Sequence, residues 1–448
     1  MRFTPHTPED RRLMLEAIGV KDISELFSTI PEDLRLGQEL RLPHPLSEPE
    51  VRAELERLAS RNTGTSRLAC FAGAGAYDHY VPAVIDTILA RPEFYTAYTP
   101  YQAEVSQGTL QSIYEFQSLI CRLFEMEVCN ASMYDCASAL GETIHLARDV
   151  TKLTRVVVSA GLNPRYLEVM RTYASGLNVP IDVVPLAGLV TDMAALERSV
   201  AEPAAAIFIQ HPNFFGYLEP VREVARLCHQ HNILLVVAVD PISLGLITPP
   251  GAYDADVAVA EGQALGLPLN FGGPYLGIMT AKRKYIRNMP GRIVARTVDI
   301  EGRTGYVLAL QTREQHIRRE KATSNICTNQ ALCALAATVY LSVMGREGIK
   351  EVARQCLAKS HYLANEIGKV SGFQPETGAP FFKEFVVKTP VPAAEVIAAG
   401  LSRNILAGVD LGQFNSDWRN RLLVAVTEKR SRTELDRYVT FLREEFQN

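Results

Sequence analysis

The stretch "LLVVAVDP", residues 234–241, decides the fold. Six apolar residues follow one another, and an aspartate comes directly after them. A short run that is apolar on both faces is typical of a strand in a parallel sheet that helices cover on both sides. Asp240 would then lie at the carboxyl edge of the sheet, where α/β proteins bind ligands. A carboxylate that caps the turn at Pro241 explains the same residue equally well.

The neighbouring sequence repeats this pattern. Short apolar runs alternate with segments that have helical character, such as "LEPVREVARLCHQHN" (218–232). The other apolar runs are residues 154–160, 180–186, 204–210 and 255–261. Strands that alternate with helices predict a parallel sheet within an α/β domain.

The composition changes along the chain and predicts three parts. A polar, proline-interrupted helical arm occupies residues 1–64, and a large α/β domain occupies residues 65–329. A smaller C-terminal α/β domain, residues 330–448, begins with a long helical stretch. Strand candidates at 383–389 and 421–427 and a last helix at 431–446 complete it.

The bulk numbers exclude several classes of function. The chain of 448 residues has a net charge of −4 and no basic stripe beside an aromatic platform, so we expect no nucleic-acid partner. No run of about 18 apolar residues occurs, so no membrane span is expected. Eight cysteines without a C-x-x-C pair, and an N-terminus unlike a signal peptide, favour a reduced, cytoplasmic protein. His229 and His231 lack an evident third ligand, so no metal site is predicted.

Two stretches combine polar groups in a way that suits a binding site. "FYTAYTPYQAEVSQG" (94–108) interleaves Tyr95, Tyr98 and Tyr101 with hydroxyl and amide residues, and such aromatics shape small-molecule pockets or interfaces. "KATSN" (321–325) places hydroxyl and amide groups where we expect a helix to begin. Those groups could cap the helix or bind a phosphate.

A third stretch, "MYDCASALGETIHLA" (133–147), also predicts the start of a helix. Backbone N–H groups there could hold an anion. A helix capped by Asp135 or Ser138 accounts for the same pattern without a ligand.

Three motifs resemble the P-protein of the glycine cleavage system, glycine dehydrogenase (decarboxylating). They are "YTAYTPYQAEVSQG" (95–108), "GLPLNFGGPYLG" (266–277) and the segment from "MPGRIVARTVD" to "KATSNICTNQ" (289–330). The resemblance extends over essentially the whole chain. It implies a fold of the aspartate-aminotransferase type, fold type I of the pyridoxal-phosphate enzymes, with active sites at a dimer interface.

The chain has the length of one half of the long form of this family, and its motifs resemble the N-terminal half. The resemblance therefore implies subunit 1 of a two-subunit enzyme, whose subunit 2 binds pyridoxal phosphate covalently. The complex would decarboxylate glycine and transfer the aminomethyl group to the lipoyl arm of H-protein. We expect residues of this chain to complete the pocket: Tyr95, Tyr98, Tyr101 and Gln102 toward the substrate, and Thr323, Ser324 and Asn325 toward the phosphate of the partner's cofactor.

The lysine pattern agrees with a chain that carries no cofactor of its own. Gln263 stands where the active half would place the lysine that forms the Schiff base, counting back from "GGP". An amide cannot form that bond. No lysine occurs between Lys152 and Lys282. The alternatives are a self-sufficient pyridoxal-phosphate enzyme that uses Lys282 or Lys321, and a catalytically inactive regulatory or scaffold subunit.

Overall fold

The computed structural model describes residues 5–38 and 40–447 and divides the chain into two compact units, Met1–Thr63 and Gly64–Asn448. The first unit contains helices α1 (Pro8–Ile18) and α2 (Glu48–Ala59), joined by two short 3-10 turns. Helix α2 begins directly after Ser47, which forms a capping box with Glu50.

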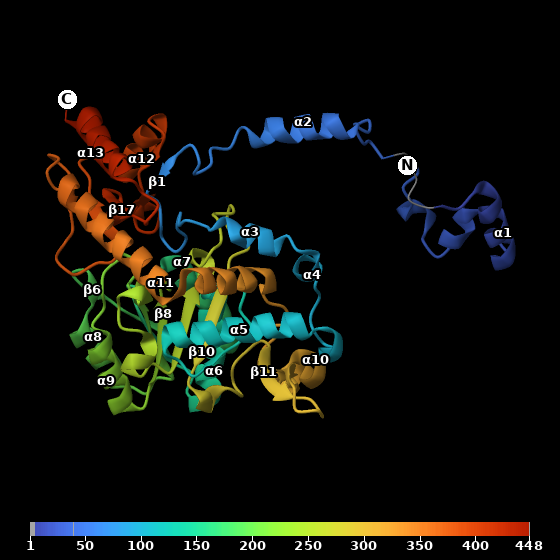
Figure 1. The fold of residues 1–448 in the computed structure, drawn as a ribbon, viewed down its shortest axis with the longest axis horizontal. Coiled ribbons are helices and arrows are strands. Elements are labelled where there is room, and N and C mark those ends of the chain that lie inside the picture. Colours follow the sequence, from blue (N-terminus) through green and yellow to red (C-terminus); the bar gives the residue numbers. More distant parts are fainter. Residues whose placement is uncertain (1–4, 39, 448) are drawn as a thin grey trace. The chain divides into compact units, whose positions relative to one another are not determined.

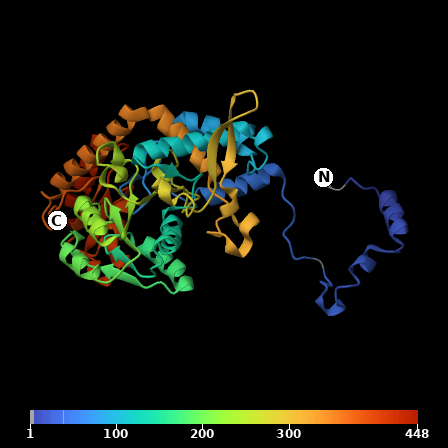
Figure 2. The same cartoon turned by 90° about the horizontal axis from the view of Figure 1, so that it is seen from below.

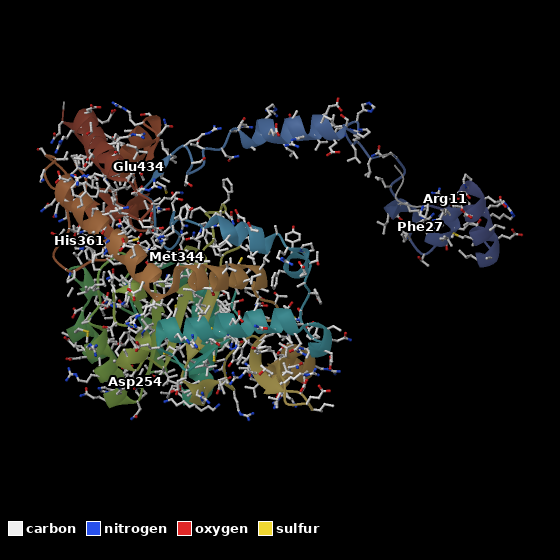
Figure 3. The ribbon with its side chains drawn as sticks, in the orientation of Figure 1. Arg11, Phe27, Asp254, Met344, His361 and Glu434 are labelled. Carbon is white, nitrogen blue, oxygen red and sulfur yellow. The ribbon has the colours of Figure 1, made fainter. Side chains whose placement is uncertain are left out.

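The first unit buries none of its described side chains. Apolar residues such as Leu13, Phe27 and Leu55 are between 45 and 59% exposed. Figure 3 labels Arg11 and Phe27 among the side chains of this unit. A segment with an apolar face but no core of its own needs a second surface to cover that face.

The second unit is built on a seven-stranded sheet whose strands follow the order β2-β10-β9-β8-β7-β3-β4 (Figure 1). The predicted strands occur within a few residues of the expected positions, and β3, β4, β7, β8 and β9 pair in parallel. Strand β10 runs antiparallel to both of its neighbours. The bounds are β2 (Val128–Cys129), β3 (Val156–Ser159), β4 (Ile181–Val184), β7 (Ala206–His211), β8 (Leu234–Val239), β9 (Val257–Glu261) and β10 (Gly277–Ala281).

Strand β8 shows why the run that decides the fold is apolar throughout. Leu235, Val237 and Val239 pack into a core on one face of the sheet. Leu234 and Val236 pack into a second core on the other face. Since neither face meets water, alternation between apolar and polar residues would leave polar groups buried.

Helices cover both faces. Helices α5 (Gln107–Phe124), α9 (Val221–His231) and α11 (Ala331–Ile367) contribute to the first core, and α6 (Cys136–Thr151) and α7 (Pro164–Leu177) contribute to the second. In Figure 2 the strands lie between α5 and α11 on one side and α6 on the other. The predicted three-layer α/β arrangement is therefore present.

Helix α11 extends from the first core into a third one. Gly345 has φ of 57° and kinks the helix, so that its last turns pack against a four-stranded sheet of order β13-β14-β17-β16. By length and mean hydropathy alone α11 could cross a membrane, but 44% of its most apolar window is buried, as in a core helix. Phe71, Phe214 and Tyr217 also join this third core. The domain boundaries at 64/65 and 329/330 stay a proposal.

A hairpin of β11 (Ile293–Val298) and β12 (Thr304–Ala309) packs against α5 and was not predicted. The remaining elements are short or lie at the ends of the cores. They are β1 (Ala69–Cys70), α3 (Ala83–Leu89), α4 (Pro92–Tyr95), β5 (Leu186–Ala187), β6 (Val190–Thr191), α8 (Met193–Ser199), α10 (Gln315–Arg318), β13 (Gln374–Pro375), β14 (Glu384–Lys388), α12 (Ala393–Ser402), β15 (Ile405–Leu406), β16 (Val409–Asp410), β17 (Arg421–Ala425) and α13 (Arg432–Phe446).

Candidate functional site

Asp240 lies at the carboxyl end of β8 and fits both interpretations of its sequence. One carboxylate oxygen, Oδ1, accepts the backbone N–H of Ile242 at 3.0 Å and so caps the turn after the strand. The other, Oδ2, lies 2.6 Å from Nζ of Lys383. Asp240 therefore caps the turn with one oxygen and forms an ion pair with Lys383 at the edge of the sheet with the other.

Lys383 is the residue at this edge that the sequence analysis missed. Its side chain is only 2% exposed, and its ammonium also lies 3.0 Å from Nε2 of His79 and 3.5 Å from the ring centroid of Tyr77. The one available signal was a lysine and a glutamate between the phenylalanines of "FFKEF", residues 381–385. A lysine in such a run is buried only when it has a partner.

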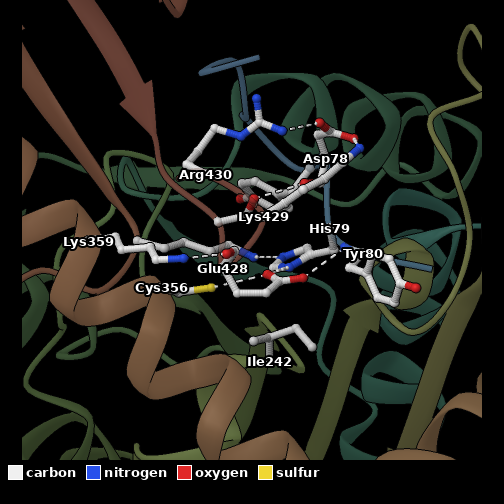
Figure 4. Close-up of polar contacts among 12 residues, drawn as sticks. Asp78, His79, Tyr80, Ile242, Cys356, Lys359, Glu428, Lys429 and Arg430 are labelled. Carbon is white, nitrogen blue, oxygen red and sulfur yellow. Dashed lines mark hydrogen bonds and ion pairs between the residues drawn. The ribbon is translucent and has the colours of Figure 1, made fainter. Parts of the chain in front are cut away.

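His79 connects Lys383 to a second carboxylate, that of Glu428. Figure 4 shows His79 beside Glu428. Nδ1 of His79 lies 2.6 Å from Oε2 of Glu428, and the other oxygen of Glu428 accepts the backbone N–H of Tyr80 at 2.7 Å. Although burial acts to raise it, the pKa of Glu428 is lowered to about 2 by the charge and hydrogen bond of His79. These contacts hold the chain around His79 against the segment that follows strand β17.

His79, Glu428 and Cys356 could each offer a ligand atom to a metal ion. The chemistry of the donors argues against that use. Burial raises the pKa of the Cys356 thiol, so the thiol stays protonated, and the Lys383 ammonium faces the free nitrogen of His79. The cluster is better described as a hydrogen-bonded network.

Gln263 is buried and its amide is fully bonded. The carbonyl oxygen accepts the backbone N–H of Tyr77 at 2.8 Å, and the amide nitrogen donates to the carbonyl oxygens of Tyr77 at 3.0 Å and Leu267 at 2.7 Å. The side chain therefore forms a reciprocal pair with the backbone N–H and C=O of one residue, Tyr77. A lysine has no acceptor and could not reproduce this pair.

The start of α6 is held by carboxylates of the chain itself. Asp135 is the N-cap and accepts the backbone N–H of Ser138 at 2.7 Å, which confirms the capping interpretation. Oε2 of Glu261 accepts the N–H of Cys136 at 3.3 Å, and its Oε1 accepts the N–H of Leu276 at 2.9 Å. Burial raises the pKa of Glu261 to about 8. Two of the N–H donors that could hold a phosphate at this helix, those of Cys136 and Ser138, are thus already bonded.

An open cleft of about 740 Å³ lies beside these groups, with Asp135, Asn163, Tyr166 and Glu261 among its walls. Next to Asp240 the space narrows to a cavity of about 30 Å³. That volume holds a water molecule or two and no aromatic ring.

The aromatic loop forms a second pocket. Tyr95 and Tyr98, which are 70 and 84% exposed, line a cavity of about 220 Å³ together with Arg292 and Asn329. The Tyr101 hydroxyl lies 3.4 Å from Nη2 of Arg292. The structure thus brings three predicted tyrosines to one place; Gln102 is exposed beside them.

The expectation that "KATSN" opens a helix is wrong. Helix α11 begins at Ala331, and residues 324–330 have no regular structure. Two hydrogen bonds hold the segment in a non-helical form: Ser324 Oγ accepts the N–H of Ile326 at 3.0 Å, and the Gln330 N–H donates to Oγ of the distant Ser132 at 3.1 Å. Thr323 and Ser324 are half-buried and Asn325 is exposed.

Solved structures agree with this architecture. The sphingosine-1-phosphate lyase of Burkholderia pseudomallei aligns over 93% of this chain and 94% of its own with a TM-score of 0.64 at 14% identity. A glutamate decarboxylase of Lactobacillus brevis aligns over 92 and 95% with a TM-score of 0.66 at 13% identity. At such identities the likeness concerns the fold alone. The fold is that of the fold type I pyridoxal-phosphate enzymes.

More similar relatives narrow this class to a family. A sequence model described as glycine cleavage system P-protein matches residues 1–442, so the chain belongs to the glycine cleavage system P-protein family. Proteins called probable glycine dehydrogenase (decarboxylating) subunit 1 are 51% identical in Moorella thermoacetica and 52% in Carboxydothermus hydrogenoformans, each over 99% of both chains. A crystal structure of glycine decarboxylase (P-protein) of the glycine cleavage system, in inhibitor-bound form, has a TM-score of 0.90 at 41% identity and covers 99% of this chain and 100% of its own.

Proposed function

We propose that this chain is the subunit of a two-subunit glycine decarboxylase that carries no covalent cofactor. The partner, subunit 2, binds pyridoxal phosphate, and the assembled cytoplasmic enzyme decarboxylates glycine and passes the aminomethyl group to the lipoyl arm of H-protein. The name of the relatives, subunit 1, supports a partner of this kind. The observation that carries the proposal is the bonded amide of Gln263 at the lysine position.

The residues at the sheet edge do not fit pyridoxal phosphate. The ring nitrogen of the cofactor needs a free carboxylate, but Asp240 is paired with Lys383 at 2.6 Å. The phosphate needs free N–H donors, but Asp135 and Glu261 accept two of them, from Ser138 and Cys136, at the start of α6. Lys282, the alternative Schiff-base residue, is paired with Asp254 at 2.8 Å and Asp256 at 3.0 Å. We therefore propose that no chemical step takes place on a cofactor bound to this chain.

The contribution of the chain would be made by residues of the aromatic loop and of the segment 323–325. Tyr95, Tyr98, Tyr101 and Gln102 would border the partner's substrate pocket, and Thr323, Ser324 and Asn325 would face the phosphate of its cofactor. Tyrosine suits this role because its rigid apolar body excludes water and its hydroxyl donates one hydrogen bond. Tyr95 and Tyr98 line one cavity, and the Tyr101 hydroxyl lies beside Arg292 of the same cavity, which supports the first assignment.

Reduction with borohydride in the presence of pyridoxal phosphate tests the proposal. The purified chain should show no stoichiometric labelling of any lysine, whereas the co-expressed pair should be labelled on the partner alone. One labelled lysine on this chain, together with decarboxylation of glycine by the chain alone, would establish the self-sufficient enzyme instead. An assembled pair whose activity does not depend on this chain would leave a scaffold role.

A further inference from the structure

Arg292 is a buried cation that the proposed function does not use. It precedes β11, its side chain is 7% exposed, and it lines the 220 Å³ cavity of the aromatic loop. The nearest carboxylate belongs to Glu314, whose Oε2 lies 4.0 Å from Nε of Arg292. That separation is too long for a hydrogen bond, and Nε has no hydrogen-bond partner among the described residues.

The other nitrogens of Arg292 meet neutral acceptors only. Nη1 lies 3.3 Å from the Asn329 side-chain oxygen, and Nη2 lies 3.4 Å from the Tyr101 hydroxyl and 2.5 Å from the carbonyl oxygen of Cys327. Glu314 is equally incomplete, because its Oε1 also lacks a partner within the described chain. A buried guanidinium is normally satisfied by a carboxylate in a bidentate geometry.

The walls of this cavity suit a small ligand with one charged end. Thr109, Ser112 and Thr328 are polar residues of the wall, and Ile113 and Leu332 are apolar ones. A volume of 220 Å³ is below the roughly 300 Å³ at which pockets for drug-sized molecules begin. The Arg292 guanidinium is the one cationic side chain in this lining.

We infer that Arg292 and the cavity beside Tyr98 form a binding site for a small carboxylate. The inference rests on the proposed function for its biological ligand, which is the carboxylate of glycine or the bicarbonate that forms from the released carbon. Arg292 binds this group before or after the reaction and does not stabilise the loss of CO2, because a firmly paired carboxylate decarboxylates less readily. It is therefore a specificity-determining residue for the substrate's charged end.

Binding of 13C-formate to the full chain, followed by NMR line broadening, tests the site without the partner. The wild-type chain should bind formate, and Arg292→Gln should weaken this at least tenfold. Arg296→Gln is the matched control, because Arg296 lies exposed on β11 and makes the same change of charge. Methylammonium, which has the opposite charge, should not compete.

If Arg292→Gln does not fold, Ser112→Leu replaces it. The added side chain fills the cavity from α5 and leaves the contacts of Arg292 in place, and it should abolish formate binding by the same tenfold criterion. Unchanged formate affinity in the folded variants overturns the inference.

The co-expressed pair then assigns the ligand. Arg292→Gln should raise KM for glycine, or for bicarbonate in the reverse exchange, at least tenfold with little change in kcat, the pattern of lost uniform binding. A raised KM for glycine alone identifies the substrate carboxylate as the ligand, and a raised KM for bicarbonate alone identifies the product. Unchanged values for both in an active pair overturn the assignment and leave the proposed function standing. A pair that assembles but never decarboxylates glycine fails the proposed function itself.

Discussion

The ion pair between Lys383 and Asp240 shows how one residue can occupy the edge of the sheet at which related folds bind ligands. The ammonium takes the place beside the aspartate that a bound cation would need, and 2% exposure means that water does not screen it. A buried pair of this kind contributes little net stability when intact, but removing one partner leaves an unpaired charge inside the protein.

We expect Lys383→Met to lower the free energy of unfolding by about 3–5 kcal/mol, because Asp240 loses its counter-charge. The double variant Lys383→Met/Asp240→Asn should recover at least 0.5 kcal/mol relative to the sum of the single changes. Urea unfolding measures all three. Lys350→Met is the control, since Lys350 lies on the surface and pairs with Glu347 alone. Strict additivity of the two changes would show that the residues are not coupled.

Glu384 makes stability depend on pH. Burial raises its pKa to about 7, although the N–H of Ala74 and the hydroxyl of Tyr77 donate to it and act to lower it. Between its usual value of 4.5 and about 7 the folded chain keeps a proton that the unfolded chain has released. The contribution of Glu384 to stability therefore falls as pH rises through this window, by up to about 1.4 kcal/mol per pH unit.

Glu384→Gln cannot titrate, so its free energy of unfolding should gain on that of the wild type from about pH 4.5 to about pH 7 and then run parallel to it. Urea unfolding of both chains at half-unit steps gives the difference. Other titrating groups cancel in that difference. A constant difference across the window would mean that Glu384 is ionised in the folded chain throughout.

Among the elements, α6 has a start at which carboxylates of the chain accept N–H groups that could otherwise bind an anion. Asp135→Ala should cost about 0.5–2 kcal/mol, because the N–H of Ser138 loses its acceptor. Asp149→Ala is the matched control at the exposed last turn of the same helix, where a negative charge opposes the dipole. Thermal and urea unfolding should show a loss for the first variant and no loss for the second. Equal effects would mean that the cap does not decide the stability of α6.

The aromatic loop and the segment 321–325 carry the prediction that links this chain to the partner's site. Tyr98→Phe and Thr323→Val change little volume and should leave assembly with the partner intact. Loss of one hydrogen bond to a charged group should lower decarboxylation or cofactor affinity at least tenfold, about 1.4 kcal/mol. Steady-state kinetics and cofactor titration of the co-expressed pair give both values. Normal kinetics and cofactor affinity in both variants would leave these stretches a packing role.

Most of the fold could be predicted because its signals are local. An apolar run predicts strand β8, and the capping box of Ser431 and Glu434 marks the start of helix α13. The site could be predicted only in part. Gln263 and Asp240 lie in motifs that the sequence shows. Lys383 lies 143 positions after Asp240, directly before strand β14, and no local pattern predicts such a contact. The sequence predicts the start of α11 several residues too early. The Gln330 N–H donates to Ser132, a residue distant in the chain, and this bond holds the preceding segment in a non-helical form.

At the scale of the whole molecule, the first unit exposes the apolar faces of its helices. In α2 the apolar residues Val51, Leu55 and Leu58 follow the spacing of one helix face, and all three are more than 40% exposed. We propose that this unit packs against the partner subunit. Obligate interfaces are large and apolar, which is the property that these helices offer.

Light scattering of the co-expressed chains should show a complex with equal amounts of both, two copies of each. Leu55→Asp should weaken association at least tenfold, because it buries a charge against the partner. Arg57→Asp is the matched control: it introduces the same residue on the opposite face of α2 and loses only an exposed pair with Glu54. A chain that stays monomeric beside the partner would contradict the two-subunit enzyme.

The bonds of Gln263 also bear on the history of the chain. Reversion to lysine leaves the Tyr77 N–H without an acceptor, at a cost of about 1–3 kcal/mol, while Lys383 still covers Asp240 and carboxylates still cap α6. We therefore expect that Gln263→Lys alone does not restore catalysis, and that the gene persists only in genomes that keep a homologous gene with a lysine at this position.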